Sequence, residues 1–226
     1  MKFLTTIPLQ SRTIDATVYA HSDSEAPGII FLHDLMGAVP VVHEAASRIS
    51  EQGYHVLVPD LYSGGISQTK YCTSHIFSKA MLFNEAKDNV HMDEIHQIID
   101  FFKGYKNVKG KGIGIVGQCL TGGFILHAAI REDVKAPVVF HHSFGIKGSG
   151  IPEEDASKIQ NTIQGHYSNF DPLCPKARVD KLQQQIGNHL VRYQYWLPHG
   201  IPHLFFNNKQ AELAFSRMIT HFRENL

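Results

Sequence analysis

Residues 113–124 read Ile-Gly-Ile-Val-Gly-Gln-Cys-Leu-Thr-Gly-Gly-Phe. The run from Ile113 to Val116 is short and apolar, which is typical of a strand that helices cover on both faces. It passes through a tight turn around Cys119 into residues 123–130, which we expect to form a helix. Strands that alternate with helices build parallel sheets. The stretch therefore predicts one repeat unit of an α/β fold.

Similar apolar runs and helical segments recur on both sides of this stretch, and no internal repeat or linker divides them. Residues 13–19 alternate polar and apolar side chains, which predicts a half-exposed strand at an edge of the sheet. The alternation as a whole predicts a mostly parallel central sheet between two helical layers, a three-layer α/β/α sandwich in a single domain over residues 1–226. The other expected strands are 28–32, 55–58, 136–140, 162–167 and 190–197, and the expected helices are 42–52, 79–102, 123–130, 175–186 and 208–222.

Composition and charge exclude several classes of protein. The 226 residues include 21 basic and 21 acidic side chains, so the basic excess that draws a protein to nucleic acid or anionic lipid is missing. The first residues lack the apolar run of a signal peptide, and no stretch approaches the ~20 apolar residues of a membrane span. Three cysteines, Cys72, Cys119 and Cys174, suit a reducing compartment. We expect a cytoplasmic monomer or weak homodimer with no nucleic-acid or membrane partner.

The turn around Cys119 is close to the pattern Gly-x-nucleophile-x-Gly, with cysteine as the nucleophile. Such a nucleophile stands on a sharp, strained turn between a strand and a helix, so its neighbours must be small. Gly117 meets this need, but Thr121 occupies the other glycine position, and we expect it to tilt the turn or crowd the acyl pocket. A helix N-terminus favours a thiolate, and the N–H of Leu120 is placed to stabilise an oxyanion.

An acid and a base follow Cys119 in the order that a hydrolase triad requires. Asp171 comes after the strand expected at 162–167, and His203 comes after the strand expected at 190–197 and before the last helix. An aspartate before proline often serves only a turn, and one histidine among 15 is weak evidence. Three such residues in order, each directly after a strand, nevertheless predict a triad of Cys119, Asp171 and His203.

Five segments of the chain resemble the dienelactone hydrolase family of α/β-hydrolases. The cysteine turn and the sequence Pro-Asp-Leu-Tyr at 59–62 are together fairly specific for that family. The resemblance implies the α/β-hydrolase fold and hydrolysis of a small ester, lactone or thioester through an acyl-enzyme. The matching segments are 31–37, 53–62, 117–123, 165–175 and 198–205, which cover nearly the whole domain.

The resemblance also implies roles for single residues. By position, Cys119 is the nucleophile, Asp171 the triad acid and His203 the base. The N–H of Leu35 is the second oxyanion donor, and Asp34 occupies the place of a glutamate that contacts the resting thiol in the archetype. Asn207 stands where the archetype has an arginine that grips the substrate carboxylate, so dienelactone itself is not the expected substrate. Neither a metal nor a cofactor is expected.

Two other functions compete with this prediction. The histidine count suggests a metal hydrolase, but the chain has no His-Glu-x-x-His, since 43–47 ends in serine. Pro198 and Pro202 also disfavour a helix that would present His199 and His203 together. The second alternative is a catalytically silent α/β-hydrolase-fold module that only binds a ligand. Faster alkylation of Cys119 than of the other cysteines would distinguish an enzyme from such a module.

Overall fold

A computed structural model describes residues 1–78, 91–142, 149–196 and 209–226. The described strands form one sheet in the order β1-β2-β4-β3-β5-β6-β7-β8. Pairing is antiparallel from β1 to β4 and parallel from β4 to β8, so most of the sheet is parallel as predicted. The strands are β1 (Lys2–Pro8), β2 (Thr13–Tyr19), β3 (Ala26–Phe31), β4 (His55–Pro59), β5 (Val108–Cys119), β6 (Val134–His142), β7 (Ile163–Ser168) and β8 (Leu190–Tyr195).

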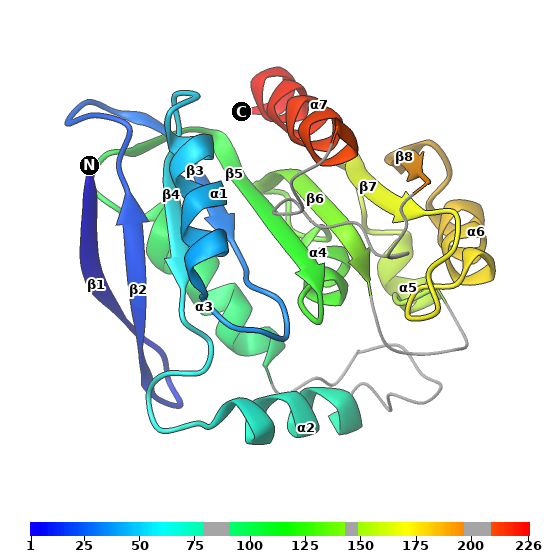
Figure 1. The fold of residues 1–226 in the computed structure, drawn as a ribbon, viewed down its shortest axis with the longest axis horizontal. Coiled ribbons are helices and arrows are strands. Elements are labelled where there is room, and N and C mark those ends of the chain that lie inside the picture. Colours follow the sequence, from blue (N-terminus) through cyan, green and yellow to red (C-terminus); the bar gives the residue numbers. More distant parts are fainter. Residues whose placement is uncertain (79–90, 143–148, 197–208) are drawn as a thin grey trace.

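Helices cover both faces of this sheet, which confirms the three-layer α/β/α prediction (Figure 1). Helices α1 (Pro40–Ser50) and α7 (Lys209–Asn225) pack on one face, where Val42, Ile49 and Met218 are fully buried. Helices α3 (Met92–Lys103), α4 (Gly122–Ala128) and α6 (Lys176–Ile186) cover the other face. The remaining helices are α2 (Gln68–Ser78), α5 (Glu153–Ala156) and a short 3₁₀ turn, Gly187–His189.

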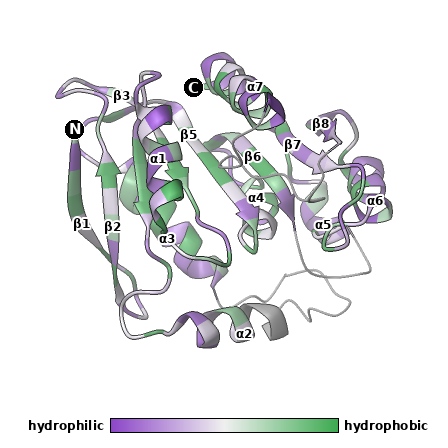
Figure 2. Ribbon diagram, viewed as in Figure 1, coloured by the Kyte–Doolittle hydropathy of each residue, from purple (hydrophilic) through white to green (hydrophobic). Residues whose placement is uncertain are grey.

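The pattern of buried and exposed side chains matches these three layers. Figure 2 shows hydrophobic residues along the strands and many hydrophilic ones on the outer helices α6 and α7. Two apolar clusters fill the space on the two sides of the sheet, because each strand sends alternate side chains to opposite faces. Within the ranges that the structure describes, no helix has the length and the apolar character needed to cross a membrane.

The prediction that residues 13–19 form an edge strand is wrong. Strand β1 pairs antiparallel with β2, from Lys2 opposite Tyr19 to Pro8 opposite Thr13, and β1 is the edge. The polar and apolar alternation in β2 has another cause, since Thr13 and Asp15 face solvent while Ile14 between them is buried. The alternation therefore indicates that one face of β2 is exposed, and it does not indicate that β2 lies at the edge of the sheet.

The helix predicted over 79–102 is confirmed only in its second part, where α3 spans Met92–Lys103. Residues 79–90 lie outside the described residues. Helix α2 was not predicted, because its sequence has only a weak apolar periodicity. Gly53, expected to end the first helix, has a φ of +103°, the backbone conformation that favours glycine at that position.

Candidate active site

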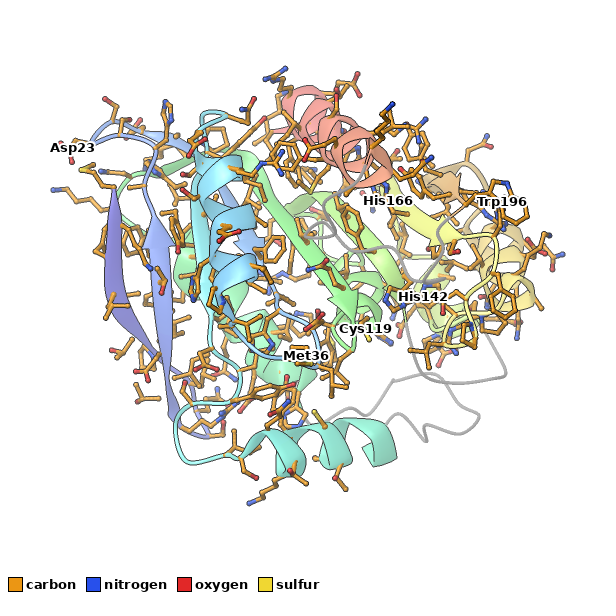
Figure 3. All side chains as sticks on the ribbon, viewed as in Figure 1. Asp23, Met36, Cys119, His142, His166 and Trp196 are labelled. Carbon is orange, nitrogen blue, oxygen red and sulfur yellow. The ribbon has the colours of Figure 1, made fainter. Side chains whose placement is uncertain are left out.

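Cys119 lies at the tip of a sharp turn between β5 and α4. Its φ is 53°, in the left-handed region that a residue with a Cβ rarely adopts. Helix α4 begins at Gly122, and the cysteine itself is 8% exposed. Figure 3 shows Cys119 at the same end of the sheet as Met36 and His142. Strained backbone of this kind is typical of functional residues, and here it occurs where the sequence predicts the nucleophile.

Two glycines make the turn possible. A Cβ on Gly117 would come within 2.4 Å of Ile125 Cγ1 and 2.8 Å of the Thr121 carbonyl oxygen. A Cβ on Gly122 would lie 2.2 Å from the carbonyl oxygen of His141 in the neighbouring strand. Both approaches are closer than van der Waals contact allows. The strand β5 and the helix α4 can therefore meet at Cys119 only with glycine at these two positions.

Thr121 braces the turn, although we expected it to tilt the turn or crowd the acyl pocket. Its φ of −91° is helical, so this position needs no glycine. The hydroxyl accepts the N–H of Gln118 at 3.1 Å and can donate to the Gln118 carbonyl at 3.1 Å or the Leu32 carbonyl at 3.5 Å. Threonine thus closes the turn on itself and ties it to the end of β3.

Strand β6 carries a bulge opposite the turn. Gln118 pairs with Phe140 and Cys119 pairs with His142, which leaves His141 as an extra residue between them. His141 has a φ of 41° and is fully buried. The bulge accommodates the bend at Cys119 and turns the His141 side chain toward the next loop. The sequence does not predict this bulge, because a bulge depends on pairing between strands.

Asp171 lies in the loop that follows β7 and is 6% exposed. Its Oδ1 accepts the N–H groups of Leu173 at 2.8 Å and Cys174 at 3.1 Å, as a turn-forming aspartate does. Its Oδ2 lies 3.5 Å from Nδ1 of His141 and accepts no hydrogen bond within the described residues. Burial raises the pKa of this carboxyl group, and the two N–H donors oppose the rise. One carboxylate oxygen therefore holds the turn, and the other lies beside the His141 ring.

The loop after β3 contains Asp34 and Leu35, and a buried histidine controls its shape. The N–H of Leu61 donates to His33 Nε2 at 3.0 Å, so the proton of the neutral ring is on Nδ1. Nδ1 then donates to the carbonyl oxygen of Asp34 at 2.8 Å. Burial lowers the pKa of His33, which keeps the ring neutral and this tautomer in place. His33 thus joins the loop after β3 to the loop after β4.

Two further side chains hold the same loop. Tyr62 Oη donates to the carbonyl oxygen of Leu35 at 3.0 Å, and the amide of Gln68 reaches the same oxygen at 2.6 Å. The carboxylate Oδ1 of Asp34 accepts the N–H of Met36 at 2.8 Å. Burial raises the pKa of the Asp34 carboxyl group. These contacts leave the loop little freedom, although the segment is not part of a helix or strand.

The loop and the turn each present an N–H group without an internal acceptor. Within the described part of the chain, neither the N–H of Leu35 nor that of Leu120 donates a hydrogen bond. In a trans peptide the N–H points away from the carbonyl, so the N–H of Leu35 points away from His33. An oxyanion hole needs two such donors, and this role for Leu35 and Leu120 stays a prediction.

The structure thus brings most predicted residues to the carboxyl edge of the sheet. Cys119 and Leu120 come from the turn after β5, Asp34 and Leu35 from the loop after β3, and Asp171 from the loop after β7. Asp34 Oδ1 serves its own turn, so contact with the thiol remains a prediction. The predicted base His203 lies outside the described residues, as do His199 and Asn207.

Metal-ligating side chains do not gather anywhere in the four described ranges. No group of three or more histidine, cysteine, aspartate or glutamate side chains there could hold a metal ion.

Comparison with known proteins agrees with this site. The model of the dienelactone hydrolase family matches residues 14–226. The chain belongs to this family. Members of the dienelactone hydrolase family break ester or lactone bonds, so the protein is a hydrolase of that class.

Individual relatives of the dienelactone hydrolase family are distant. A human carboxymethylenebutenolidase homolog is 25% identical over 91% of this chain and 81% of its own length. A carboxymethylenebutenolidase of Rhodococcus opacus is 22% identical over 79% of this chain and 72% of its own length. The crystal structure of a dienelactone hydrolase from Anabaena variabilis superposes with a TM-score of 0.70 at 13% identity, covering 100% of this chain and 98% of that one. The two chains therefore share a fold.

Proposed function

We propose that the protein hydrolyses a small ester, lactone or thioester through an acyl-enzyme on Cys119. The observation that carries the proposal is the left-handed backbone of Cys119 at the tip of the turn, together with the N–H groups of Leu35 and Leu120, which have no acceptor among the described residues. A thiol at this position is exposed to an attacked carbonyl, and the donors at Leu35 and Leu120 match the charge that the carbonyl oxygen acquires.

Each residue has one role in the proposed reaction. His203 takes the thiol proton as the sulfur attacks the carbonyl carbon, and Asp171 holds the imidazole in one tautomer. The tetrahedral intermediate collapses with loss of an alcohol or thiol, which receives the proton from His203. Water, deprotonated by the same imidazole, then attacks the thioester, releases the acid and restores the thiol. Each oxyanion donor contributes about 10²–10³ in kcat in well-studied hydrolases.

The first test compares Cys119→Ala with Cys119→Ser on a panel of 4-nitrophenyl esters, lactones and thioesters. The alanine variant should lose at least about 10³-fold in kcat, because no group remains to form the acyl-enzyme. Mass spectrometry of the quenched wild type should show an added acyl group on the peptide that contains Cys119. Full activity of the alanine variant would contradict the proposal, and metal loss that abolishes turnover would point to a metal hydrolase.

A second test uses alkylation by iodoacetamide. Cys72 is a matched comparison for Cys119, because each is 8% exposed. Faster reaction of Cys119 therefore reports activation of its thiol and not greater access. Equal and slow reaction of both cysteines, together with no turnover, would favour a catalytically silent module that binds a ligand.

We also infer a reducing compartment such as the cytoplasm, and a monomer or weak homodimer. The three cysteines form no disulfide, which supports a compartment where thiols persist. Cell fractionation tests the location, and sedimentation across a range of concentrations tests the oligomeric state.

A further inference from the structure

Large hydrophobic side chains are exposed around the candidate active site. Leu35 and Met36, in the loop after β3, are 40% and 64% exposed. Phe170 and Leu173, in the loop after β7, are 73% and 40% exposed. Isolated exposed apolar side chains are ordinary, but several of them on the two loops that flank the turn at Cys119 favour a binding surface. We call these four residues the apolar rim.

The two loops border Cys119 from opposite sides. Strand β3 neighbours β5, where the N–H of Leu32 donates to the Val116 carbonyl at 2.9 Å. On the other side, β6 pairs with β5 at Cys119, and His141 of β6 contacts Asp171 in the loop after β7. Met36 and Cys119 lie at one end of the sheet in Figure 3. A molecule bound over the sulfur would therefore meet apolar side chains on both sides.

The acidic residues of these loops turn inward. Asp34 and Asp171 are 4% and 6% exposed, and each uses Oδ1 to accept N–H groups of its own turn. Residues 32–38 and 168–174 contain neither lysine nor arginine. Arg178, whose Nη2 lies near Gly150 and His142, is only 2% exposed. The exposed hydrophobic side chains of both loops are thus free of neighbouring lysine or arginine within the loops themselves, and the charged side chains that the two loops contribute are buried carboxylates.

We propose that the site takes a neutral substrate whose hydrocarbon group lies on the apolar rim, and that it discriminates against substrates carrying a carboxylate. The proposal rests on the hydrolase function proposed above and names its substrate class. A hydrocarbon group gains from leaving water at this surface. A substrate carboxylate would lose its hydration on this surface, where the described residues of the two loops offer no lysine or arginine to pair with it, and it would lie above two buried acids.

The test is a matched set of 4-nitrophenyl esters, each corrected for its uncatalysed hydrolysis rate. The value of kcat/KM should rise from acetate to hexanoate, by about two- to fourfold for each methylene that is buried. The pentanoate and the glutarate monoester share a carbon count and differ in the terminal carboxylate. We expect the pentanoate to be preferred by at least about tenfold.

Single lysines on the rim should change this ratio. Met36→Lys and Leu173→Lys each place a cation beside the substrate, and each should lower the preference for pentanoate over glutarate by about fivefold or more. Leu213→Lys is the matched control, because Leu213 is a 44% exposed hydrophobic residue on α7. Its ratio should equal that of the wild type.

Three results would overturn the proposal. A ratio near one, or a preference for the glutarate monoester, would overturn the substrate class and leave the hydrolase function intact. Absence of turnover of every ester above the Cys119→Ala background would overturn both. The third result combines two measurements: sedimentation shows a dimer that Met36→Lys and Leu173→Lys break, and the ratio of pentanoate to glutarate hydrolysis stays unchanged in both variants. It would show that the apolar rim binds a second copy of this chain.

Discussion

The loops that carry Asp34 and Asp171 are similar in outline but are held in place differently. Each follows a parallel strand, buries an aspartate whose Oδ1 accepts N–H groups of its own turn, and exposes hydrophobic neighbours. The first is held through its backbone carbonyls, by His33 and Tyr62. The second is held through its carboxylate and leaves Oδ2 near His141.

Because the two loops are held differently, they can contribute different groups to a reaction. A loop fixed by its carbonyls presents N–H groups, because the two ends of a trans peptide point in opposite directions. A loop fixed through one carboxylate oxygen presents the other oxygen to a ring N–H. In the proposed function, the loop after β3 therefore stabilises the oxyanion and the loop after β7 orients the imidazole.

The largest expected effect comes from exchanging the two acids for amides. Asp171→Asn should lower kcat/KM by about 10³- to 10⁴-fold, because an amide NH₂ favours the wrong imidazole tautomer. Asp34→Asn should lower it by less than about tenfold, since an asparagine Oδ1 still accepts the N–H of Met36. Steady-state kinetics on one activated ester measures both variants. Equal losses, with both proteins folded by circular dichroism, would contradict the division of roles.

The next effect concerns the residue that holds the loop after β3. His33→Ala should lower kcat by about tenfold to a hundredfold with little change in KM, because the peptide that bears the N–H of Leu35 is no longer fixed. The variant also leaves the N–H of Leu61 without its acceptor, which costs about 1–3 kcal/mol of stability.

A conservative variant separates positioning from simple destabilisation. His33→Gln retains a side-chain amide that can donate to the Asp34 carbonyl, so it should recover part of kcat. Urea unfolding of the alanine and glutamine variants supplies the stability comparison. Unchanged kcat in a folded His33→Ala protein would show that the loop keeps its shape without this histidine.

The third prediction concerns the contact between the turn at Cys119 and β6, the strand whose His141 lies beside Asp171. Gly122→Ala places a Cβ 2.2 Å from the His141 carbonyl oxygen, a backbone atom that cannot move aside. We expect a loss of about 2–3 kcal/mol in the free energy of unfolding. Gly104→Ala is the control, because its Cβ would meet nothing closer than 3.5 Å. Similar losses in the two variants would show that the close approach at Gly122 is relieved.

Much of the fold was predictable because its signals are local. The buried strands β3 to β6 each contain a short apolar run, which can be recognised from consecutive residues alone. Strand β1 and helix α2 were missed because both have weak periodicity. Their positions depend on packing, β1 on its pairing with β2 and α2 on contacts such as Tyr71 in the core.

The candidate site likewise has features that the sequence predicts and features that it does not. The turn at Cys119 was predictable, since a strand, a strained residue and a helix in sequence require glycine at fixed places. The roles of His33 and His141 were not, because their partners Leu61 and Asp171 are far away in the chain. Thr121 was interpreted as a departure that harms the turn. Only the hydrogen bonds of its hydroxyl explain why threonine suits this position.

The smallest expected effect is on the pH dependence of stability. Burial raises the pKa of Asp171, so between the ordinary carboxyl pKa and the raised one the folded protein binds more protons than the unfolded chain. The contribution of this group to stability therefore falls as pH rises through that window. Asp171→Asn removes the cost of the buried charge, and its Oδ1 still accepts the N–H of Leu173. The variant should melt above the wild type at pH 7, and the difference should shrink toward pH 4.

The contribution of Glu94 to stability should change with pH in the opposite direction. Burial raises its pKa, but hydrogen bonds from His91, Arg12 and Ser11 outweigh this and lower the pKa of Glu94 to about 2. Its contribution to stability is complete above the unfolded carboxyl pKa and is lost as pH falls toward 2. Glu94→Gln should therefore melt below the wild type at pH 7, and the two should converge in acid. If Asp171→Asn instead followed the Glu94→Gln pattern, the charge on Asp171 would be stabilised in the fold, and its carboxylate would have to be paired with a cation such as protonated His141.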